Sequence, residues 1–202
     1  MKILYGTTNK AKLSTMKKVV DPLGIELIGL NDLDVEIPPV NECGKTPLEN
    51  ARIKAKAYYN AFHMPVFSCD SGLYFDELED DRQPGIHVRR VDGKELNDEE
   101  MILYYAALAE QHGGKLIARY RNAICLILNE KIAYDSMDIS LATEPFVLVS
   151  KPHPKRVDGF PLDSLSKDIA SNEYYYDLKE KDVSTSAMEE GFRVFFSRIV
   201  SV

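Results

Sequence analysis

Short apolar runs alternate along the chain with longer segments in which apolar residues recur every three or four positions. The short runs predict β-strands, and the periodic segments predict amphipathic α-helices. The expected strands are residues 3–5, 26–29, 66–69, 116–128 and 132–141, and the expected helices run through residues 13–20, 46–62 and 98–111, with a C-terminal helix ending near Ile199. Strands that alternate with helices favour an α/β fold, and a hairpin expected around residues 129–131 makes its sheet mixed.

Polar residues mark where the first two helices should begin. Thr8 or Asn9 suits the N-cap of the first helix, because a short polar side chain can accept hydrogen bonds from its first turn. The second helix matches a capping box, with Thr46 at the N-cap, Pro47 at the first helical position and Glu49 at the third.

Length and composition limit the class of protein. The 202 residues suit one domain, or one domain of two lobes. Hydrophobic residues make up 45% and charged residues 28%, which excludes a disordered or fibrous chain. The net charge of −7 argues against a protein that binds DNA or RNA in general, although a local cluster of Lys and Arg can still hold one small anion.

Cysteines and histidines are few and widely spaced. Cys43, Cys69 and Cys125 form no closely spaced pair, and the four histidines are isolated, so a disulfide framework and a structural zinc site are both disfavoured. No apolar run approaches the ~18 residues of a membrane span, and the start lacks the apolar segment of a signal peptide. We therefore expect a cytoplasmic protein with reduced thiols and no membrane partner.

The turn before the first helix carries groups that suit a phosphate. Two hydroxyls, an amide and two ammonium groups gather there, from Thr7, Thr8, Asn9, Lys10 and Lys12. A helix N-terminus adds unpaired N–H groups and the positive end of the helix dipole. The alternative is an ordinary N-cap with lysines in solvent, and the Walker sequence of P-loop proteins is absent.

Two carboxylates are candidates for holding a metal ion. Asp70 follows the apolar run 66–69, and ligands of α/β proteins bind at the carboxyl ends of strands. Glu49 lies at the start of the second helix. If Glu49 and Asp70 both lie near the phosphate-binding turn, they suit Mg²⁺, which prefers a few carboxylates together with phosphate oxygens. The alternatives are a capping role for Glu49 and an Asx-turn at Asp70.

Four segments then occur in the order of a known family. They are residues 7–12 (TTNKAK), 46–55 (TPLENARIKA), 70–73 (DSGL) and 84–90 (PGIHVRR). They resemble the patterns T-G-N-x-x-K, T-x-x-E-N-A-x-x-K-A, D-D-S-G-L and P-G-x-x-S-A-R of the inosine triphosphate pyrophosphatase (Ham1-like) family. The resemblance covers residues 1 to about 110 and is thinner beyond residue 115.

The resemblance implies an α/β fold with an elongated mixed sheet, flanking helices and two lobes around a central cleft. It implies Mg²⁺-dependent hydrolysis of a nucleoside triphosphate, such as ITP or XTP, to the monophosphate and pyrophosphate, by a homodimer. It assigns metal-binding and catalytic roles to Glu49 and Asp70. It assigns substrate-binding roles to Thr8, Asn9, Lys12, Lys54, Ser71, Arg90, Phe160, Asp163 and Lys181.

The chain also departs from the family patterns. Cys69 stands where the paired D-D has its first carboxylate, and Thr15 replaces an acidic residue beyond the phosphate lysine. The G-F-G-Y-D-P motif appears as residues 159–164 (GFPLDS), which keep the aromatic and the aspartate. Residues 185–187 (TSA) replace the S-H-R that usually reads the purine, so the base preference can differ by orders of magnitude.

Three functions remain open on this basis. The first is an active nucleoside triphosphate pyrophosphatase, which the polyphosphate and metal positions favour. The second is a nucleotide-binding module that has lost its chemistry, in line with Cys69 and the missing S-H-R. The third is a phosphatase that releases orthophosphate, which the identity of the product would distinguish.

Overall fold

The computed structural model describes residues 1–178 and 187–200, and it divides the chain into two compact units. Unit 1 contains Met1–Ser71, Arg121–Thr143 and the C-terminal helix. Unit 2 contains Gly72–Tyr120 and, of the described residues, 144–178. Two long strands, β3 (Val66–Phe75) and β6 (Lys115–Asn129), each contribute one part to either unit.

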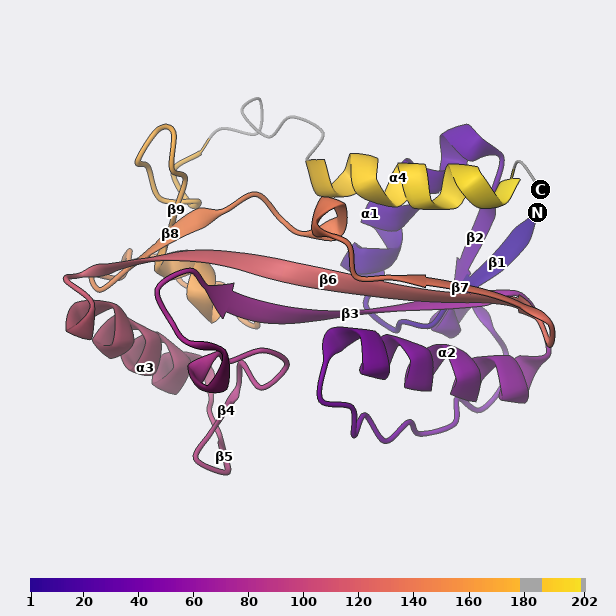
Figure 1. The fold of residues 1–202 in the computed structure, drawn as a ribbon, viewed down its shortest axis with the longest axis horizontal. Helices are drawn as coiled ribbons and strands as arrows, with labels where there is room; N and C mark the ends of the chain where they lie inside the picture. Colours follow the sequence, from indigo (N-terminus) through magenta and orange to yellow (C-terminus); the bar gives the residue numbers. More distant parts are fainter. Residues whose placement is uncertain (179–186, 201–202) are drawn as a thin grey trace. The chain divides into compact units, whose positions relative to one another are not determined.

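Unit 1 has a mixed sheet with helices on both faces. Strands β2 (Glu26–Gly29), β1 (Lys2–Tyr5) and β3 pair in parallel in that order, and β6 forms an antiparallel hairpin with β7 (Ile132–Ser136). The helices of unit 1 are α1 (Lys10–Val20), α2 (Pro47–Phe62) and α4 (Ala187–Val200). Figure 1 shows α1 and the yellow α4 on one side of these strands and α2 on the other.

The two faces of this sheet bury different side chains. Phe67 of β3 packs with Val19 of α1 and Phe196 of α4 in the larger core cluster of unit 1. On the opposite face, two alanines of α2, Ala51 and Ala55, are fully buried against β6. Their small side chains allow the helix backbone to approach the strand closely. Val66 of β3 packs with Tyr58 of α2, so side chains of β3 meet α1 and α4 on one face and α2 on the other.

Unit 2 packs one helix against the remaining strands. Its core is surrounded by the helix α3 (Asp98–Gln111), the end of β3, the start of β6, β8 (Phe146–Val149) and β9 (Ser166–Lys167). A two-stranded hairpin of β4 (Arg90–Val91) and β5 (Lys94–Glu95) lies beside it. β6, β8 and β9 pair in antiparallel fashion. Leu73 and Phe75 of β3 pack in this core with Tyr105 of α3. Short 3-10 helices occupy Asp21–Leu23, Leu30–Asp32, Asp80–Arg82, Ile139–Leu141 and Pro161–Ser164.

The α/β class with a mixed sheet is confirmed, and the expected helices are all present among the described residues. The prediction that this strand ends at Cys69 is wrong, because β3 continues to Phe75. Leu73 and Phe75 alternate into the core of unit 2, and this burial keeps the polar stretch between the two cores extended. In contrast, β7 is shorter than expected and ends at Ser136, because the chain then forms the 3-10 helix Ile139–Leu141, which Asp138 caps. A single domain with two lobes around a cleft remains a prediction.

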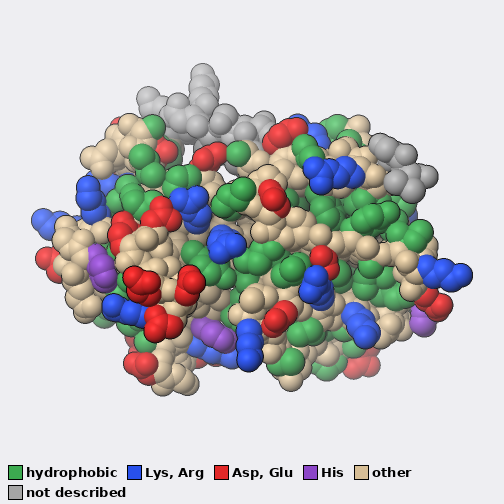
Figure 2. Space-filling model, in the orientation of Figure 1, with side chains coloured by type: hydrophobic (Ala, Val, Ile, Leu, Met, Phe, Trp, Pro, Cys, Tyr) green, Lys and Arg blue, Asp and Glu red, His purple; other side chains and the backbone are tan. Residues whose placement is uncertain are grey.

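Charged side chains of both signs are interspersed on the face of the molecule drawn in Figure 2. Among the described residues, no helix combines the length and the apolar character that a membrane crossing requires.

Candidate functional site

The phosphate-binding turn predicted from the sequence lies at the exposed start of α1. Asn9 is the N-cap, and its Oδ1 accepts hydrogen bonds from the backbone N–H groups of Ala11 at 2.9 Å and Lys12 at 3.0 Å. The side chains of Thr8, Asn9 and Lys12 are exposed together. The capping role of Asn9 is therefore confirmed, and the exposed ammonium groups of Lys10 and Lys12 at this helix start suit an anion.

Gly6 fixes the path of this turn. A Cβ atom at Gly6 would lie 2.2 Å from Ser68 Oγ and 2.7 Å from Tyr58 Cδ2, which is closer than real contacts allow. The Gly6 amide donates a 2.8 Å hydrogen bond to the carbonyl of Phe67, which ties the turn to β3. Only glycine therefore lets the chain leave β1 here and start α1 beside β3.

Lys54 and Asp70 meet inside unit 1. Lys54 projects from α2, and its Nζ lies 3.0 Å from Asp70 Oδ1 on β3 and 2.9 Å from Glu42 Oε2. The Lys54 and Asp70 side chains are 12% and 18% exposed, whereas Glu42 is 43% exposed. Burial lowers the pKa of Lys54, but the two carboxylates more than offset it and the net pKa is raised. The ammonium is charged at neutral pH and balances Asp70.

Asp70 lies within a strand rather than after one. The predicted place of Asp70 after the strand is wrong, and so is the alternative of an Asx-turn, because residues 70–72 belong to β3 and extended backbone continues to Phe75. Side chains alternate along a strand, so Asp70 points to the face that carries α2 and Lys54. A long strand holds this carboxylate more rigidly than a turn would.

Glu49 has the capping position expected for it, with one difference. Glu49 N donates to Thr46 Oγ1 at 3.2 Å, as a capping box requires. Its carboxylate accepts from the backbone N–H of Lys45 at 2.6 Å, one residue earlier than the usual partner at the N-cap. The Glu49 side chain is exposed at the positive end of α2, where a carboxylate is stabilised by the helix dipole.

The donor chemistry of these carboxylates limits the kind of metal they could hold. Across residues 1–178 and 187–200, no group of three or more His, Cys, Asp or Glu side chains is arranged to hold a metal ion. Mg²⁺ commonly takes only one or two carboxylates and fills its other positions with water and substrate phosphates. Glu49 and Asp70 therefore do not make a closed metal cage, and carboxylates of this kind suit an ion that completes its coordination with water and phosphate oxygens.

Cys69 contributes no charge beside Asp70. Burial is the main effect that raises the pKa of its thiol to about 12, while a hydrogen bond with Tyr5 and the charge of Lys12 oppose the rise. The side chain packs against the cluster on the α1 and α4 face, opposite to the face that carries Asp70. The thiol is protonated at neutral pH, so this stretch of β3 presents one carboxylate.

Ser71 is held by a buried amide that the sequence analysis missed. Its Oγ donates to Asn122 Oδ1 at 2.6 Å, and Asn122 Nδ2 donates to the carbonyl of Leu141 at 2.7 Å. Asn122 is 8% exposed and lies in β6. Its one sequence signal is a polar residue within an apolar strand. Ser71 thereby links β3 to β6 and to the 3-10 helix after β7.

The predicted site residues of unit 2 line two separate cavities. Phe160 and Asp163 line a cavity of about 200 Å³ together with Arg89 and Tyr120. Arg90 lies on β4 and lines another cavity, of about 400 Å³. The Phe160 side chain is 52% exposed, and burial raises the pKa of Asp163. The structure therefore brings Phe160 and Asp163 together and places Arg90 elsewhere in the unit.

The remaining predicted residue falls outside the described part of the chain. Lys181 is not among residues 1–178 and 187–200, nor are Thr185 and Ser186, and Ala187 is the first residue of α4. The sequence analysis also overlooked Glu42, the second partner of Lys54. It lies in the loop before α2, where no periodic pattern distinguishes one acidic residue from another.

Curated proteins with similar sequences share a name. The chain is 39% identical over 101 residues to a dITP/XTP pyrophosphatase of Oceanobacillus iheyensis, and this match covers 50% of each chain. It is 32% identical over 132 residues to a dITP/XTP pyrophosphatase of Mannheimia succiniciproducens, which covers 64% of each chain. The matched part thus spans about half to two thirds of the length of these relatives.

Solved structures support the fold over the full chain. A Ham1 protein from Coxiella burnetii superimposes with a TM-score of 0.76 at 22% identity, covering 100% of this chain and 98% of the other. A protein from Mycobacterium abscessus, described as a nucleoside-triphosphatase / dITP/XTP pyrophosphatase, gives a TM-score of 0.68 at 22% identity, covering 96% and 98%. The sequence model of the Ham1 family matches residues 3–144. Because that match spans most of the sequence and the fold agrees along the remainder, the chain belongs to the Ham1 family.

Proposed function

We propose that this protein is a nucleoside triphosphate pyrophosphatase that acts on a non-standard purine nucleotide such as ITP, XTP or dITP. Its products would be the nucleoside monophosphate and pyrophosphate. The observation that carries the proposal is the half-buried Lys54–Asp70 pair, which joins two motifs of the family at 3.0 Å. The names of the relatives, dITP/XTP pyrophosphatase, support the same reaction class.

Each candidate site residue of unit 1 has a role in this proposal that follows from its chemistry. Water attacks the α-phosphorus, and the bond from that phosphorus to the oxygen bridging to the β-phosphate breaks. Asp70 orients the water and accepts its proton, while Lys12 and Lys54 offset charge on the triphosphate. Glu49 and Asp70 would hold a Mg²⁺, which neutralises phosphate charge when it is bound.

Unit 2 taken by itself contains groups that suit a heterocyclic base. An exposed aromatic ring at Phe160 offers a face on which a base can stack, and Asp163 adds a hydrogen-bonding carboxyl in the same cavity. We extend the proposal to a homodimer and a cytoplasmic location, as expected from the family resemblance and the reduced thiols. Size-exclusion chromatography with light scattering tests the first, and fractionation of cells tests the second.

A nucleotide panel with identified products tests the reaction. The protein is incubated with ITP, XTP, dITP, dUTP and the ordinary nucleotides, with Mg²⁺ and with EDTA, and pyrophosphate and orthophosphate are quantified separately. We expect pyrophosphate to be released from ITP, XTP or dITP in the presence of Mg²⁺ and not in the presence of EDTA. Orthophosphate as the first product would instead show a phosphatase, and no product from any nucleotide would refute the proposed reaction.

Asp70→Asn tests the role of the carboxylate. We expect turnover to fall by about 100-fold or more, within the range measured when a general base is removed. The matched control is Asp76→Asn, because Asp76 is likewise paired with a cation, Arg119, but lies outside the motif. Full activity in Asp70→Asn would remove Asp70 from the mechanism.

A second function is favoured by Cys69. Its neutral thiol leaves one carboxylate where the family pattern has two, which fits a module that binds nucleotides without hydrolysing them. Calorimetry would then show nucleotide binding by a protein that releases no product. Mg²⁺-dependent turnover by the wild-type protein would exclude this alternative.

A further inference from the structure

A salt bridge in unit 2 connects two walls of the cavity that contains Phe160. Arg89 precedes β4, and its Nη2 lies 2.6 Å from Asp98 Oδ1 at the start of α3. The other oxygen of Asp98 accepts a 2.7 Å hydrogen bond from the backbone N–H of Gly159, the residue before Phe160. One carboxylate therefore holds a guanidinium on one wall and the backbone beside the aromatic ring on the other.

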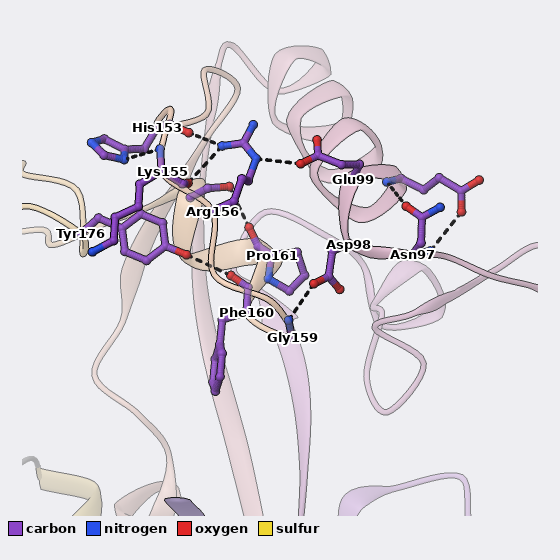
Figure 3. A network of polar contacts seen from close by, with 12 residues as sticks. Asn97, Asp98, Glu99, His153, Lys155, Arg156, Gly159, Phe160, Pro161 and Tyr176 are labelled. Carbon is purple, nitrogen blue, oxygen red and sulfur yellow. Dashed lines mark hydrogen bonds and ion pairs between the residues drawn. The ribbon is translucent and has the colours of Figure 1, made fainter.

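Figure 3 shows how the loop before Phe160 is fixed. Asp98 reaches Gly159, and the hydroxyl of Tyr176 donates to the carbonyl of Phe160 at 3.3 Å. The Phe160 ring points away from these polar contacts. Its side chain is 52% exposed, although the next two residues, Pro161 and Leu162, are buried. The backbone is thus anchored on both sides while about half of Phe160 remains exposed.

Arg89 keeps donor capacity beyond the contacts that hold it. Its Nη1 donates to the carbonyl of Leu96 at 3.3 Å and its Nη2 to Asp98, so in the described part of the chain these bonds use two of its five N–H groups. The side chain is 36% exposed and lines the cavity of about 200 Å³. A fixed guanidinium with unused donors suits a ligand that presents two adjacent acceptors.

The cavity combines this donor with a stacking face and an acceptor. Val88, Met101 and Pro161 give it apolar walls, and Asp163 adds a half-buried carboxyl. Among the heterocycles, a 6-oxopurine presents O6 and N7 side by side, the pair of acceptors that arginine binds with two hydrogen bonds. A 6-aminopurine presents an N–H donor in place of O6, so this donor would lie against the N–H donors of the guanidinium.

We propose that Arg89 is a specificity-determining residue that donates hydrogen bonds to O6 and N7 of a 6-oxopurine base stacked on Phe160. Asp98 is the positioning residue that holds the Arg89 guanidinium and the backbone before Phe160 in fixed places. The proposal rests on the proposed function for the class of ligand, a purine nucleotide, but it concerns recognition of the base and not hydrolysis.

The test measures binding, so it does not depend on whether the protein hydrolyses nucleotides. Calorimetry gives Kd for inosine 5′-monophosphate, which has O6, and for purine riboside 5′-monophosphate, which lacks it. We expect the full-length wild-type protein to bind the inosine nucleotide about 10- to 100-fold more tightly, the range for one bidentate arginine contact. Arg89→Met should reduce this ratio to about one, and Arg89→Lys should restore only part of it.

Asp98 is tested by the same ratio. Asp98→Ala should lower the preference in the same direction but by less than Arg89→Met, because the guanidinium remains and loses only its orientation. The matched control is Glu99→Ala, which removes the 2.9 Å contact with Arg156 on the same loop without touching Arg89 or Gly159. Glu99→Ala should keep the wild-type ratio, and circular dichroism should show each variant folded.

Several outcomes would overturn the proposal. They are equal affinity of the wild-type protein for both nucleotides, an unchanged ratio in Arg89→Met, an equal loss in Glu99→Ala, or no binding of either nucleotide at millimolar concentration. Tight selective binding without pyrophosphate release would refute only the proposed reaction. Pyrophosphate release with no role for Arg89 in base preference would refute only the present inference.

Deoxyuridine monophosphate, which has a carbonyl but no N7, should bind more weakly than the inosine nucleotide.

Discussion

Lys54→Met is expected to destabilise the fold by removing the cation that balances Asp70. Methionine keeps the apolar stem of the side chain, so packing of α2 against the sheet is largely retained. Lys54 and Asp70 are only 12% and 18% exposed, and the variant leaves the Asp70 carboxylate in the same half-buried place without its 3.0 Å partner. The loss is therefore larger than for a surface ion pair.

The structure sets the size of this effect between two known limits. Removing one partner of a fully buried pair costs about 3–5 kcal/mol, and an exposed pair contributes about 0.2–1 kcal/mol. The Lys54–Asp70 pair lies between them, and Glu42 adds little because it is 43% exposed and screened by solvent. We expect Lys54→Met to lower the free energy of unfolding by about 2 kcal/mol.

The pH dependence gives this prediction a definite sign. The folded-state pKa of Lys54 is raised above its ordinary value of 10.5, because attraction to Asp70 and Glu42 outweighs the opposing effect of burial. The stabilisation is then fully present below the unfolded-state pKa and is lost as the pH rises through the folded-state pKa. The difference between wild type and variant should be constant from pH 8 to about pH 10 and narrow above it.

Urea unfolding followed by circular dichroism measures this difference. Lys56→Met is the matched control, since Lys56 lies on the same helix with an exposed side chain, and it should change stability by less than about 0.5 kcal/mol. A double-mutant cycle with Asp70→Asn isolates the pairwise part. A loss in Lys54→Met no larger than in the control, or one that grows at high pH, would refute the reasoning.

Two further predictions concern the surroundings of β3. Asn122→Ala removes the partner of both Ser71 Oγ and the Leu141 carbonyl, so we expect a loss of about 1–3 kcal/mol in urea unfolding, and a loss under about 0.5 kcal/mol would contradict the link. At pH 8, a thiol reagent should modify the exposed Cys43 well before Cys69 and Cys125, because burial raises the pKa of these two thiols to about 12 and about 11. Peptide mass spectrometry measures the rates, and equal labelling of Cys43 and Cys69 in the native protein would contradict it.

Local signals predicted the helix starts well. Asn9 and Thr46 cap α1 and α2 because their side chains bond to amides two or three residues away, which neighbouring sequence alone determines. The length of β3 was not predictable in this way. Residues 70–72 are polar and resemble a turn, but they lie within β3, and Leu73 and Phe75 beyond them pack in the core of unit 2.

The contacts of the candidate site depended on residues far apart in sequence. Family motifs pointed to both Lys54 and Asp70, but nothing near them indicates Glu42 as the second partner of the lysine. Asp98 was evident only as a helix start, and its contact with Gly159 joins residues 61 positions apart. Such pairings arise from the packing of whole elements, so a single sequence shows the participating residue types but not their partners.

The alternation along β3 makes strand register a condition for function. Cys69 and Asp70 are adjacent, yet one side chain faces the α1 and α4 side and the other faces Lys54 on α2. A shift of one residue would exchange them, placing a carboxylate in the apolar cluster beside Tyr5 and a neutral thiol opposite the lysine. Backbone pairing alone tolerates such a shift, whereas the Lys54–Asp70 ion pair is possible only in the observed register. A one-residue insertion or deletion within β3 ahead of Cys69 would therefore exchange the two environments.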